Sequence, residues 1–250
     1  YPLNIQQFYN NNRNLELFRR ITNQMMDVLD YLSNGLGDKS IVHRDLRLDN
    51  IMVDRKGNLK LIDFGLALIV KKGSVISADE INTNNYYLTP EEAFGLDYDV
   101  TSDLWKAVTM LYNLKFNEDI VYPQKYSENN EIPSLNTLLR VCGKIPEDIR
   151  KQISADDKKE SRIDFAINDY LKTRIWEGKS AQEVLEQSPE VFWNRHISQN
   201  ASQKVDEEEG FVALIDFMRR VLTYLDTRVK VEDLVSHPFL QRESATSSIS

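Results

Sequence analysis

Apolar residues recur at helical spacing in the first part of the chain. Between residues 14 and 32 they stand three or four positions apart, which is typical of one face of an amphipathic helix. This apolar stripe consists of Leu15, Phe18, Ile21, Met25, Val28, Leu29 and Leu32. Gly35 and Gly37 follow it, so we expect a long helix that ends in the loop 33–40 and packs its stripe into the core.

Two short aliphatic runs come next. Residues 51–53 and 59–62 flank the segment Asp-Arg-Lys-Gly-Asn at 54–58, as expected for a small β-hairpin with a turn-rich connection. Such a hairpin would bring Asn50, at its start, beside Asp63, at its end.

The rest of the chain alternates between polar loops and helical patterns. Residues 71–87 and 117–133 are polar and lack a sustained period, so we expect loops there. The pattern around residues 101–114 is almost continuously apolar, which indicates a helix buried on most sides. Further helical patterns cover residues 135–141, 163–176, 181–193 and 211–225. The whole pattern predicts a mainly α fold.

Composition and charge exclude several classes of protein. Hydrophobic residues make up 41% of the chain and charged residues 28%, as in ordinary globular proteins. The net charge of −8 argues against binding to nucleic acid backbones or anionic membranes. The chain contains no apolar run of about 18 residues, the length that a membrane span needs. Cys142 is the single cysteine, so an internal disulfide is excluded, and we expect an intracellular protein, cytoplasmic or nuclear.

The segment 41–68 contains most of the residues that could carry out catalysis. It contains His-Arg-Asp-Leu beginning at His43, an asparagine at position 50, five residues after Asp45, and Asp-Phe-Gly beginning at position 63. Transfer of a phosphoryl group from ATP needs a carboxylate that accepts the proton of the attacking hydroxyl, and oxygen ligands that hold Mg²⁺ on the phosphates. Asp45 can supply the first, and Asn50 and Asp63 can supply the second.

These motifs resemble the catalytic half of a eukaryotic protein kinase. Thr89-Pro90-Glu91 stands where the family has Ala-Pro-Glu, and Asp103 matches the aspartate of the family's buried central helix. Arg228, nine residues before His237-Pro238-Phe239, matches the arginine that pairs with the glutamate of Ala-Pro-Glu. The resemblance extends over about residues 15–240.

The resemblance implies a role for each matched residue of the catalytic centre. Asp45 is expected to be the catalytic base, and Arg47 to neutralise the transferring phosphate. Asn50 and Asp63 are expected to bind Mg²⁺ and thereby the ATP. The implied activity is phosphoryl transfer to serine or threonine hydroxyls of a protein substrate, because the tyrosine-kinase pattern around Arg47 is absent.

Other matched residues have supporting roles in the family. His43 is expected to orient the catalytic loop, and Arg44 to pair with a phosphorylated residue of the activation segment. Phe64 is expected to pack as a hinge beside the freely rotating Gly65. The two remaining expectations concern buried contacts: Asp103 holds the backbone of the catalytic loop, and Glu91 forms an ion pair with Arg228.

Three positions depart from the family pattern. Arg47 replaces a lysine, Thr83-Asn84 falls where the family has Gly-Thr, and Lys106-Ala107-Val108 replaces Ser-x-Gly. Arginine keeps the charge of lysine but is larger and planar. The departures favour a second hypothesis, a pseudokinase that serves as a binding scaffold or allosteric partner. A third hypothesis, a small-molecule phosphotransferase of the aminoglycoside-kinase type, fits less well because Arg44 and the Glu91/Arg228 pair are present.

The family also has a Gly-rich loop and a strand lysine before this region. Here no glycine precedes Gly35 and no lysine precedes Lys39. We therefore expect residues 1–241 to be the large C-terminal lobe alone, with little activity by itself. The expected fold class is mainly α within an α+β family fold: a helical bundle with a small β-hairpin that carries the catalytic and metal-binding loops. Residues 117–209 are expected to form an extended insert that could bind a regulatory protein, and residues 242–250 a disordered Ser-rich tail.

Overall fold

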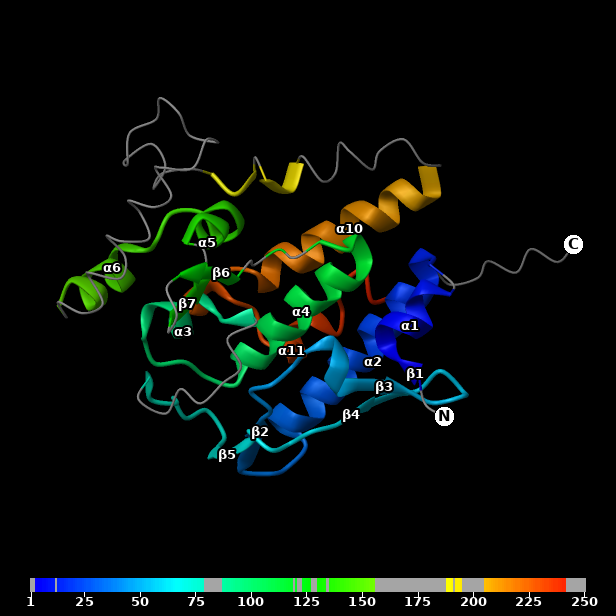
Figure 1. Ribbon diagram of the computed structural model, residues 1–250, viewed down its shortest axis with the longest axis horizontal. Coiled ribbons are helices and arrows are strands. Elements are labelled where there is room, and N and C mark those ends of the chain that lie inside the picture. The colour runs from blue at the N-terminus through cyan, green and yellow to red at the C-terminus, as the bar shows by residue number, and fades with distance from the viewer. Residues whose placement is uncertain are drawn as a thin grey trace, which may run out of the picture.

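A computed structural model describes most of the chain. The described residues are 3–11, 13–78, 87–118, 120, 123–126, 130–133, 135–155, 188–190, 192–194 and 205–241. Helix α4 (Thr101–Phe116) lies centrally among the helices, and the strands on either side of residues 43–50 lie together at one side of the molecule (Figure 1). The other helices are α1 (Ile5–Asn10), α2 (Leu15–Asn34), α3 (Pro90–Phe94), α5 (Leu135–Cys142), α6 (Glu147–Ser154), α10 (Val205–Val221) and α11 (Val231–Leu234).

Helix α4 forms the centre of the core, as its continuous apolar pattern predicts. Every residue from Thr101 to Tyr112 is buried, and the helix contacts both α2 and α10. A helix that is apolar on all sides must be covered on all sides. Because it is covered on all sides, residues on different faces of α4 contact different elements of the fold.

Helix α2 confirms the predicted stripe. The side chain of Asn14 caps its first turn by accepting a hydrogen bond from the backbone N–H of Leu17 at 2.7 Å, and Gly35 follows its last residue. Five members of the stripe are fully buried, and Leu15 and Val28 are half-buried. The buried members are Phe18, Ile21, Met25, Leu29 and Leu32. Residues 35–42 then connect the helix to the loop that begins at His43.

The described residues form three small antiparallel sheets. Strand β3 (Ile51–Val53) pairs with β4 (Leu59–Leu61), which is the predicted hairpin, and also with β1 (Leu3–Asn4). Strand β2 (Lys39–Val42) pairs with β5 (Leu68–Lys71), and β6 (Pro123–Tyr126) pairs with β7 (Asn130–Pro133). The prediction of a helical bundle with a single small hairpin is therefore wrong in its β content. Short strands that pair with distant segments have no local pattern that reveals them.

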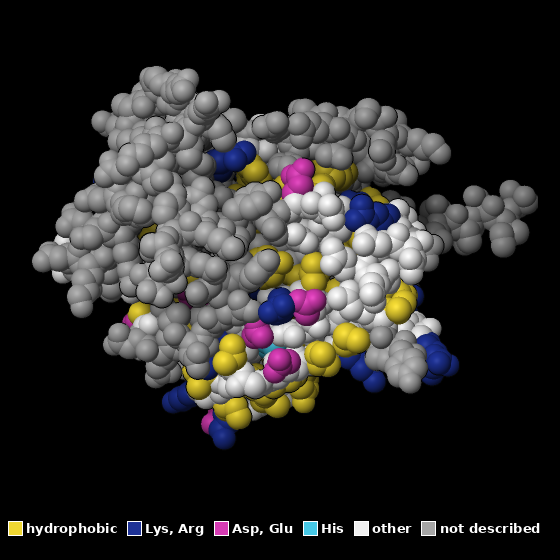
Figure 2. Space-filling model, in the orientation of Figure 1, with side chains coloured by type: hydrophobic (Ala, Val, Ile, Leu, Met, Phe, Trp, Pro, Cys, Tyr) yellow, Lys and Arg dark blue, Asp and Glu magenta, His cyan; other side chains and the backbone are white. Residues whose placement is uncertain are grey.

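Some predictions concern residues outside the described part. They include the Ser-rich tail at 242–250, the helical pattern at 163–176 and the Thr83-Asn84 departure. Within the described ranges, no helix is both long enough and apolar enough to cross a membrane. Figure 2 shows that charged side chains of both signs and apolar side chains gather on the face that carries the strands. Exposed apolar residues of this region include Ile62, Phe64 and Ile69.

Candidate active site

The hairpin β3–β4 places Asn50 and Asp63 at its open end. Ile51 lies opposite Leu61 in the register of the two strands. One step further, the backbone N–H of Ile62 donates to the carbonyl oxygen of Asn50 at 3.0 Å. Asp63 follows Ile62 directly, so the predicted juxtaposition of Asn50 and Asp63 is present.

Asn50 also fixes Asp45. Its side-chain nitrogen donates to the backbone carbonyl oxygen of Asp45 at 2.8 Å and to the Asp45 carboxylate at 3.0 Å. Asn50 is buried at the end of a short 3-10 helix, Leu48–Asn50, whereas Asp45 is half-buried. A buried amide that binds both the backbone and the side chain of Asp45 leaves its carboxylate little freedom to rotate.

His43 connects the catalytic loop to the segment before Asp63. Its Nε2 lies 3.0 Å from the carbonyl oxygen of Ile62, and its Nδ1 accepts a hydrogen bond from the backbone N–H of Asp45 at 3.3 Å. Because Nδ1 is the acceptor, this network assigns the proton to Nε2. The ring also packs edge-on against Phe64, with ring centroids 4.7 Å apart. These contacts are those of an orienting residue.

Asp103, on α4, binds the backbone of the loop that contains His43 and Arg44. Its two carboxylate oxygens accept hydrogen bonds from the N–H groups of His43 at 2.5 Å and Arg44 at 3.0 Å. Arg44 has a φ of 65°, a left-handed conformation that costs energy for a residue other than glycine. The bond to Asp103 offsets that cost. Burial raises the pKa of Asp103, while the charge of Lys106 and the two N–H groups act to lower it.

The guanidinium of Arg44 is already bound. Its Nε donates to the carbonyl oxygen of Leu66 at 2.6 Å, and the residue is buried. Leu66 follows the Asp-Phe-Gly motif directly. Arg44 therefore links the catalytic loop to the first residues of the activation segment.

Asp63 is exposed and has the same left-handed conformation, with a φ of 63°. Its carboxylate accepts a hydrogen bond from the backbone N–H of Gly65 at 3.3 Å. A Cβ atom on Gly65 would lie 3.2 Å from that carboxylate oxygen, which is closer than ordinary van der Waals contact. Glycine at position 65 thus leaves room for the Asp63 carboxylate in this position.

The oxygen atoms of Asp63 and Asn50 suit a hard cation. Mg²⁺ is usually held by one or two carboxylates together with substrate phosphates and water rather than by a complete protein cage. The described residues contain no cluster of three or more His, Cys, Asp or Glu that could hold a metal. The amide nitrogen of Asn50 is occupied by Asp45, so the amide oxygen is the atom suited to a cation.

Arg47 lies on the surface of the same loop. Its Nε donates to the carboxylate of Asp49 at 3.2 Å, and one of its terminal nitrogens contacts the same oxygen. Its side chain is 39% exposed. The structure thus places the predicted phosphate-binding arginine near Asp45 and bound to a neighbouring carboxylate.

The predicted ion pair between Glu91 and Arg228 is present and buried. Nη2 of Arg228 lies 2.9 and 3.1 Å from the two carboxylate oxygens, and the two side chains are 3% and 0% exposed. Glu91 also accepts a hydrogen bond from the N–H of Leu225 at 2.7 Å. The guanidinium of Arg228 lies 5.1 Å from the ring centroid of Trp105. The pair joins α3, α4 and the C-terminal segment.

A second buried ion pair lies beside the first and was not predicted. The ammonium of Lys106 lies 2.7 Å from a carboxylate oxygen of Glu92. The signal was available in the sequence: Lys106 interrupts an otherwise apolar helical stretch, and lysine is almost never fully buried without a partner.

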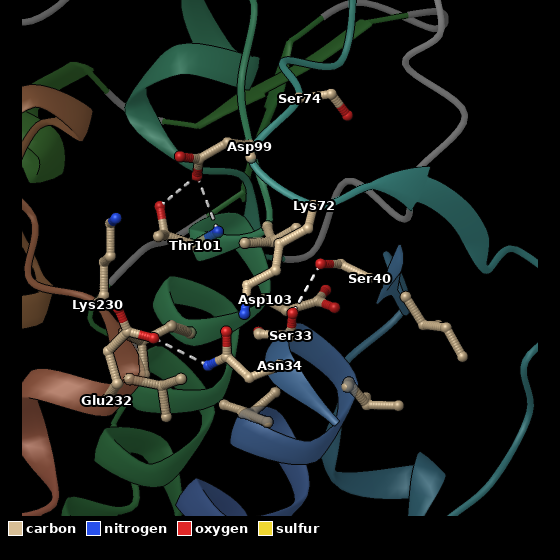
Figure 3. A pocket seen from close by; sticks show the side chains of 17 residues that line it. Ser33, Asn34, Ser40, Lys72, Ser74, Asp99, Thr101, Asp103, Lys230 and Glu232 are labelled. Atoms are coloured by element: carbon tan, nitrogen blue, oxygen red, sulfur yellow. Dashed lines mark hydrogen bonds between the residues drawn. The ribbon is translucent and has the colours of Figure 1, made fainter. Parts of the chain in front are cut away.

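A pocket of about 220 Å³ lies between α2, α4 and α11. Figure 3 shows Asp99 bound to Thr101 at its rim, Asn34 bound to Glu232, and the Lys72 side chain directed into it. Asp103 also lines this pocket, but Asp45, Asn50 and Asp63 do not. The predicted catalytic side chains therefore lie outside it.

Comparisons with a family model and with individual proteins all match protein kinases. The family model of the protein kinase domain matches residues 5–240. The probable serine/threonine-protein kinase MARK-B of Dictyostelium discoideum is 26% identical over 199 residues, covering 76% of this chain and 26% of that protein. The probable serine/threonine-protein kinase kinX of the same organism is 33% identical over 164 residues, which is 65% of this chain and 14% of kinX. Mouse Nek2, a serine/threonine-protein kinase, is 38% identical over 78 residues, which is 31% of this chain and 17% of Nek2.

The chain spans about a quarter or less of these relatives' length. The domain match nevertheless covers nearly the whole chain, so the prediction of a large lobe alone, and the fold class that depended on it, is wrong. A small β-sheet region near the start is followed by helices. The prediction relied on the absence of a Gly-rich loop and of one strand lysine, whereas the family match rests on the whole pattern of positions. The chain belongs to the protein kinase family.

Proposed function

We propose that this protein is a serine/threonine kinase that transfers the γ-phosphate of ATP to a hydroxyl group of a protein substrate. The observation that carries this proposal is the double hydrogen bond from Asn50 to Asp45, at the hairpin end beside Asp63. It supplies a fixed carboxylate in the same region as the side-chain oxygens of Asn50, which is buried, and of Asp63, which is exposed. A proton acceptor and oxygen ligands for Mg²⁺ are what phosphoryl transfer requires of a protein. The relatives named above are serine/threonine-protein kinases.

In this proposal Asp45 orients the attacking hydroxyl and accepts its proton. Asn50 holds the Asp45 carboxylate in place, and the loop backbone is held by His43 and Asp103. Positioning of this kind supplies a large part of the rate in phosphoryl transfer, because little covalent chemistry is left to the protein. Mg²⁺, when held by Asp63 and Asn50, would neutralise charge on the phosphates.

Arg47 would contribute positive charge near the transferring phosphate. Its present partner, Asp49, is on the surface, where an ion pair contributes little net stability. Exchanging that carboxylate for a phosphate oxygen therefore costs little. The positive charge at this position fits the family pattern for serine and threonine substrates.

The experiment is a phosphorylation assay on the full-length protein that contains this chain, with radiolabelled ATP, Mg²⁺ and a mixture of protein substrates. Asp45→Asn and Asp63→Ala should each lower the rate by more than about a hundredfold, because each removes a group that acts on the reacting phosphate or hydroxyl. Phosphoamino-acid analysis should find phosphoserine or phosphothreonine. Asp27→Ala, at an exposed position of α2, is the matched control and should have wild-type activity.

The pseudokinase hypothesis makes the opposite prediction. It is favoured by arginine at position 47 in place of the family's lysine and by Lys106-Ala107-Val108 in place of Ser-x-Gly. If wild-type protein, Asp45→Asn and Asp63→Ala all lack turnover above background, the kinase proposal is wrong and a binding function is supported. Equal turnover in all three would exclude Asp45 and Asp63 from the site.

A further inference from the structure

Helix α4 contains a buried cation that the catalytic roles described above do not use. Lys106 lies on α4 with a side chain that is 2% exposed, and its partner Glu92 is 0% exposed. Removing one member of such a pair leaves an uncompensated charge in the interior. The role of this pair can therefore be inferred from the other groups that Glu92 and Lys106 contact.

The two carboxylate oxygens of Glu92 have different partners. Oε1 binds the ammonium of Lys106 at 2.7 Å. Oε2 accepts a hydrogen bond from the backbone N–H of Thr89 at 2.9 Å, while the hydroxyl of Thr89 accepts from the N–H of Glu92 at 3.1 Å. This reciprocal arrangement is a capping box at the start of α3. Glu92 thus connects the end of the activation segment to α4.

Lys106 also faces the carboxylate that holds the catalytic loop. It follows Asp103 by three residues on α4, a spacing that puts both on one side of the helix. The positive charge of Lys106 is the strongest influence that opposes the effect of burial on the pKa of Asp103, ahead of the N–H groups of His43 and Arg44. Tyr98 and His43 face Asp103 as well. One ammonium therefore serves two buried carboxylates.

We propose that Lys106 is a positioning residue that couples the activation segment to the catalytic loop. It binds Glu92 at the end of the activation segment and attracts the Asp103 carboxylate, which holds the backbone of His43 and Arg44. Through that backbone it acts on Asp45. This role rests on the proposed kinase function, and it differs from the role of an ion pair that only stabilises α3 on α4.

A double variant separates the two roles. In Lys106→Gln the carboxylate of Glu92 loses its partner, so the melting temperature should fall. In Glu92→Gln/Lys106→Gln no unpaired charge remains in the pair, glutamine still completes the capping box, and the two amides can bind each other. The melting temperature should therefore recover in part. The ammonium that faces Asp103 is still missing in the double variant.

The decisive measurements are amide hydrogen exchange at His43 and Arg44 and steady-state kinetics. In the double variant we expect both amides to exchange faster by about tenfold or more, because the acceptor that protects them is weakened. We expect kcat to fall by about tenfold with an unchanged KM for ATP, because the loss affects orientation of Asp45 rather than nucleotide binding. Glu92→Gln alone keeps Lys106 and should retain slow exchange at both amides.

Each outcome decides the proposal. Wild-type exchange at His43 and Arg44 in the double variant would show that Lys106 serves Glu92 alone, and would overturn it. If the wild-type protein has no kinase activity, the proposed function fails, but the exchange experiment still tests the coupling. Glu92→Gln/Lys106→Met provides a second neutral pair should the amide pair not fold. Lys151→Met, which removes an exposed lysine paired with Glu147, is the control for loss of a positive charge.

Discussion

At the scale of single residues, the site is fixed mainly by contacts to the backbone. Asn50 binds the carbonyl oxygen of Asp45, His43 binds its N–H, and Asp103 binds two further N–H groups of the same loop. A side chain whose backbone is held on several sides needs few contacts of its own to keep its orientation. This explains how Asp45 can remain half-buried and accessible to a substrate while its position is defined.

Cys142 gives a residue-scale prediction about reactivity. It is the last residue of α5 and packs partly buried against the core. Burial raises the pKa of its thiol far above the ordinary value, an effect that the nearby Arg228 only partly opposes. Because the thiolate is the reactive form, iodoacetamide at pH 8 should modify Cys142 very slowly in the folded protein.

The check is mass spectrometry of the intact protein at timed intervals, with and without denaturant. Since the sequence contains one cysteine, any added mass reports this position directly. Modification in the folded protein at the rate seen in denaturant would show that the thiol is exposed and ionised.

At the scale of elements, the helices were predicted more completely than the strands. The stripe of α2 and the continuous apolar run of α4 follow from local spacing, because a helix repeats every few residues. The pairings β1–β3 and β2–β5 join segments far apart in the chain, and no local period encodes them. The site shows the same division. The hairpin that joins Asn50 to Asp63 could be predicted, whereas the identity of the partner of Lys106, Glu92, depends on the packing of α3 on α4.

The ion pair between Glu91 and Arg228 provides an element-scale prediction. Arg228→Ala would leave the buried Glu91 carboxylate without its charged partner, and removal of one member of a buried pair costs about 3–5 kcal/mol of stability. Urea denaturation at neutral pH should show a loss of that size. The loss should appear without nucleotide or substrate, since the pair joins α3 to the C-terminal segment.

Lys151→Ala is the matched control, because its ion pair with Glu147 is exposed on both sides. Exposed pairs contribute about 0–1 kcal/mol, so the control should unfold almost as the wild type does. If Arg228→Ala and the control lost equally little stability, the buried pair would not be a strong link between these elements.

At the scale of the whole molecule, the end of the described chain packs back onto α2. Nε of Arg19 donates to the carbonyl oxygen of Phe239 at 2.9 Å, and the side-chain nitrogen of Asn23 donates to that of Leu240 at 3.1 Å. The ring of Phe239 is fully buried between Phe18 and Phe217. Residues more than two hundred positions apart in sequence thus share one core.

This packing of the C-terminal segment on α2 predicts that Phe239→Ala lowers the stability of the whole domain, which should still unfold in one step. Truncating a buried phenylalanine typically costs about 3–5 kcal/mol, and here the lost contacts involve both α2 and α10. Urea denaturation followed by circular dichroism and by tryptophan fluorescence should show a single transition at lower denaturant concentration for both signals. Val235→Ala, at an exposed position just after α11, should change stability by less than about 0.5 kcal/mol. Separate transitions for the two signals would instead mean that the C-terminal segment unfolds independently of α2, and that the catalytic loop following α2 does not depend on this packing.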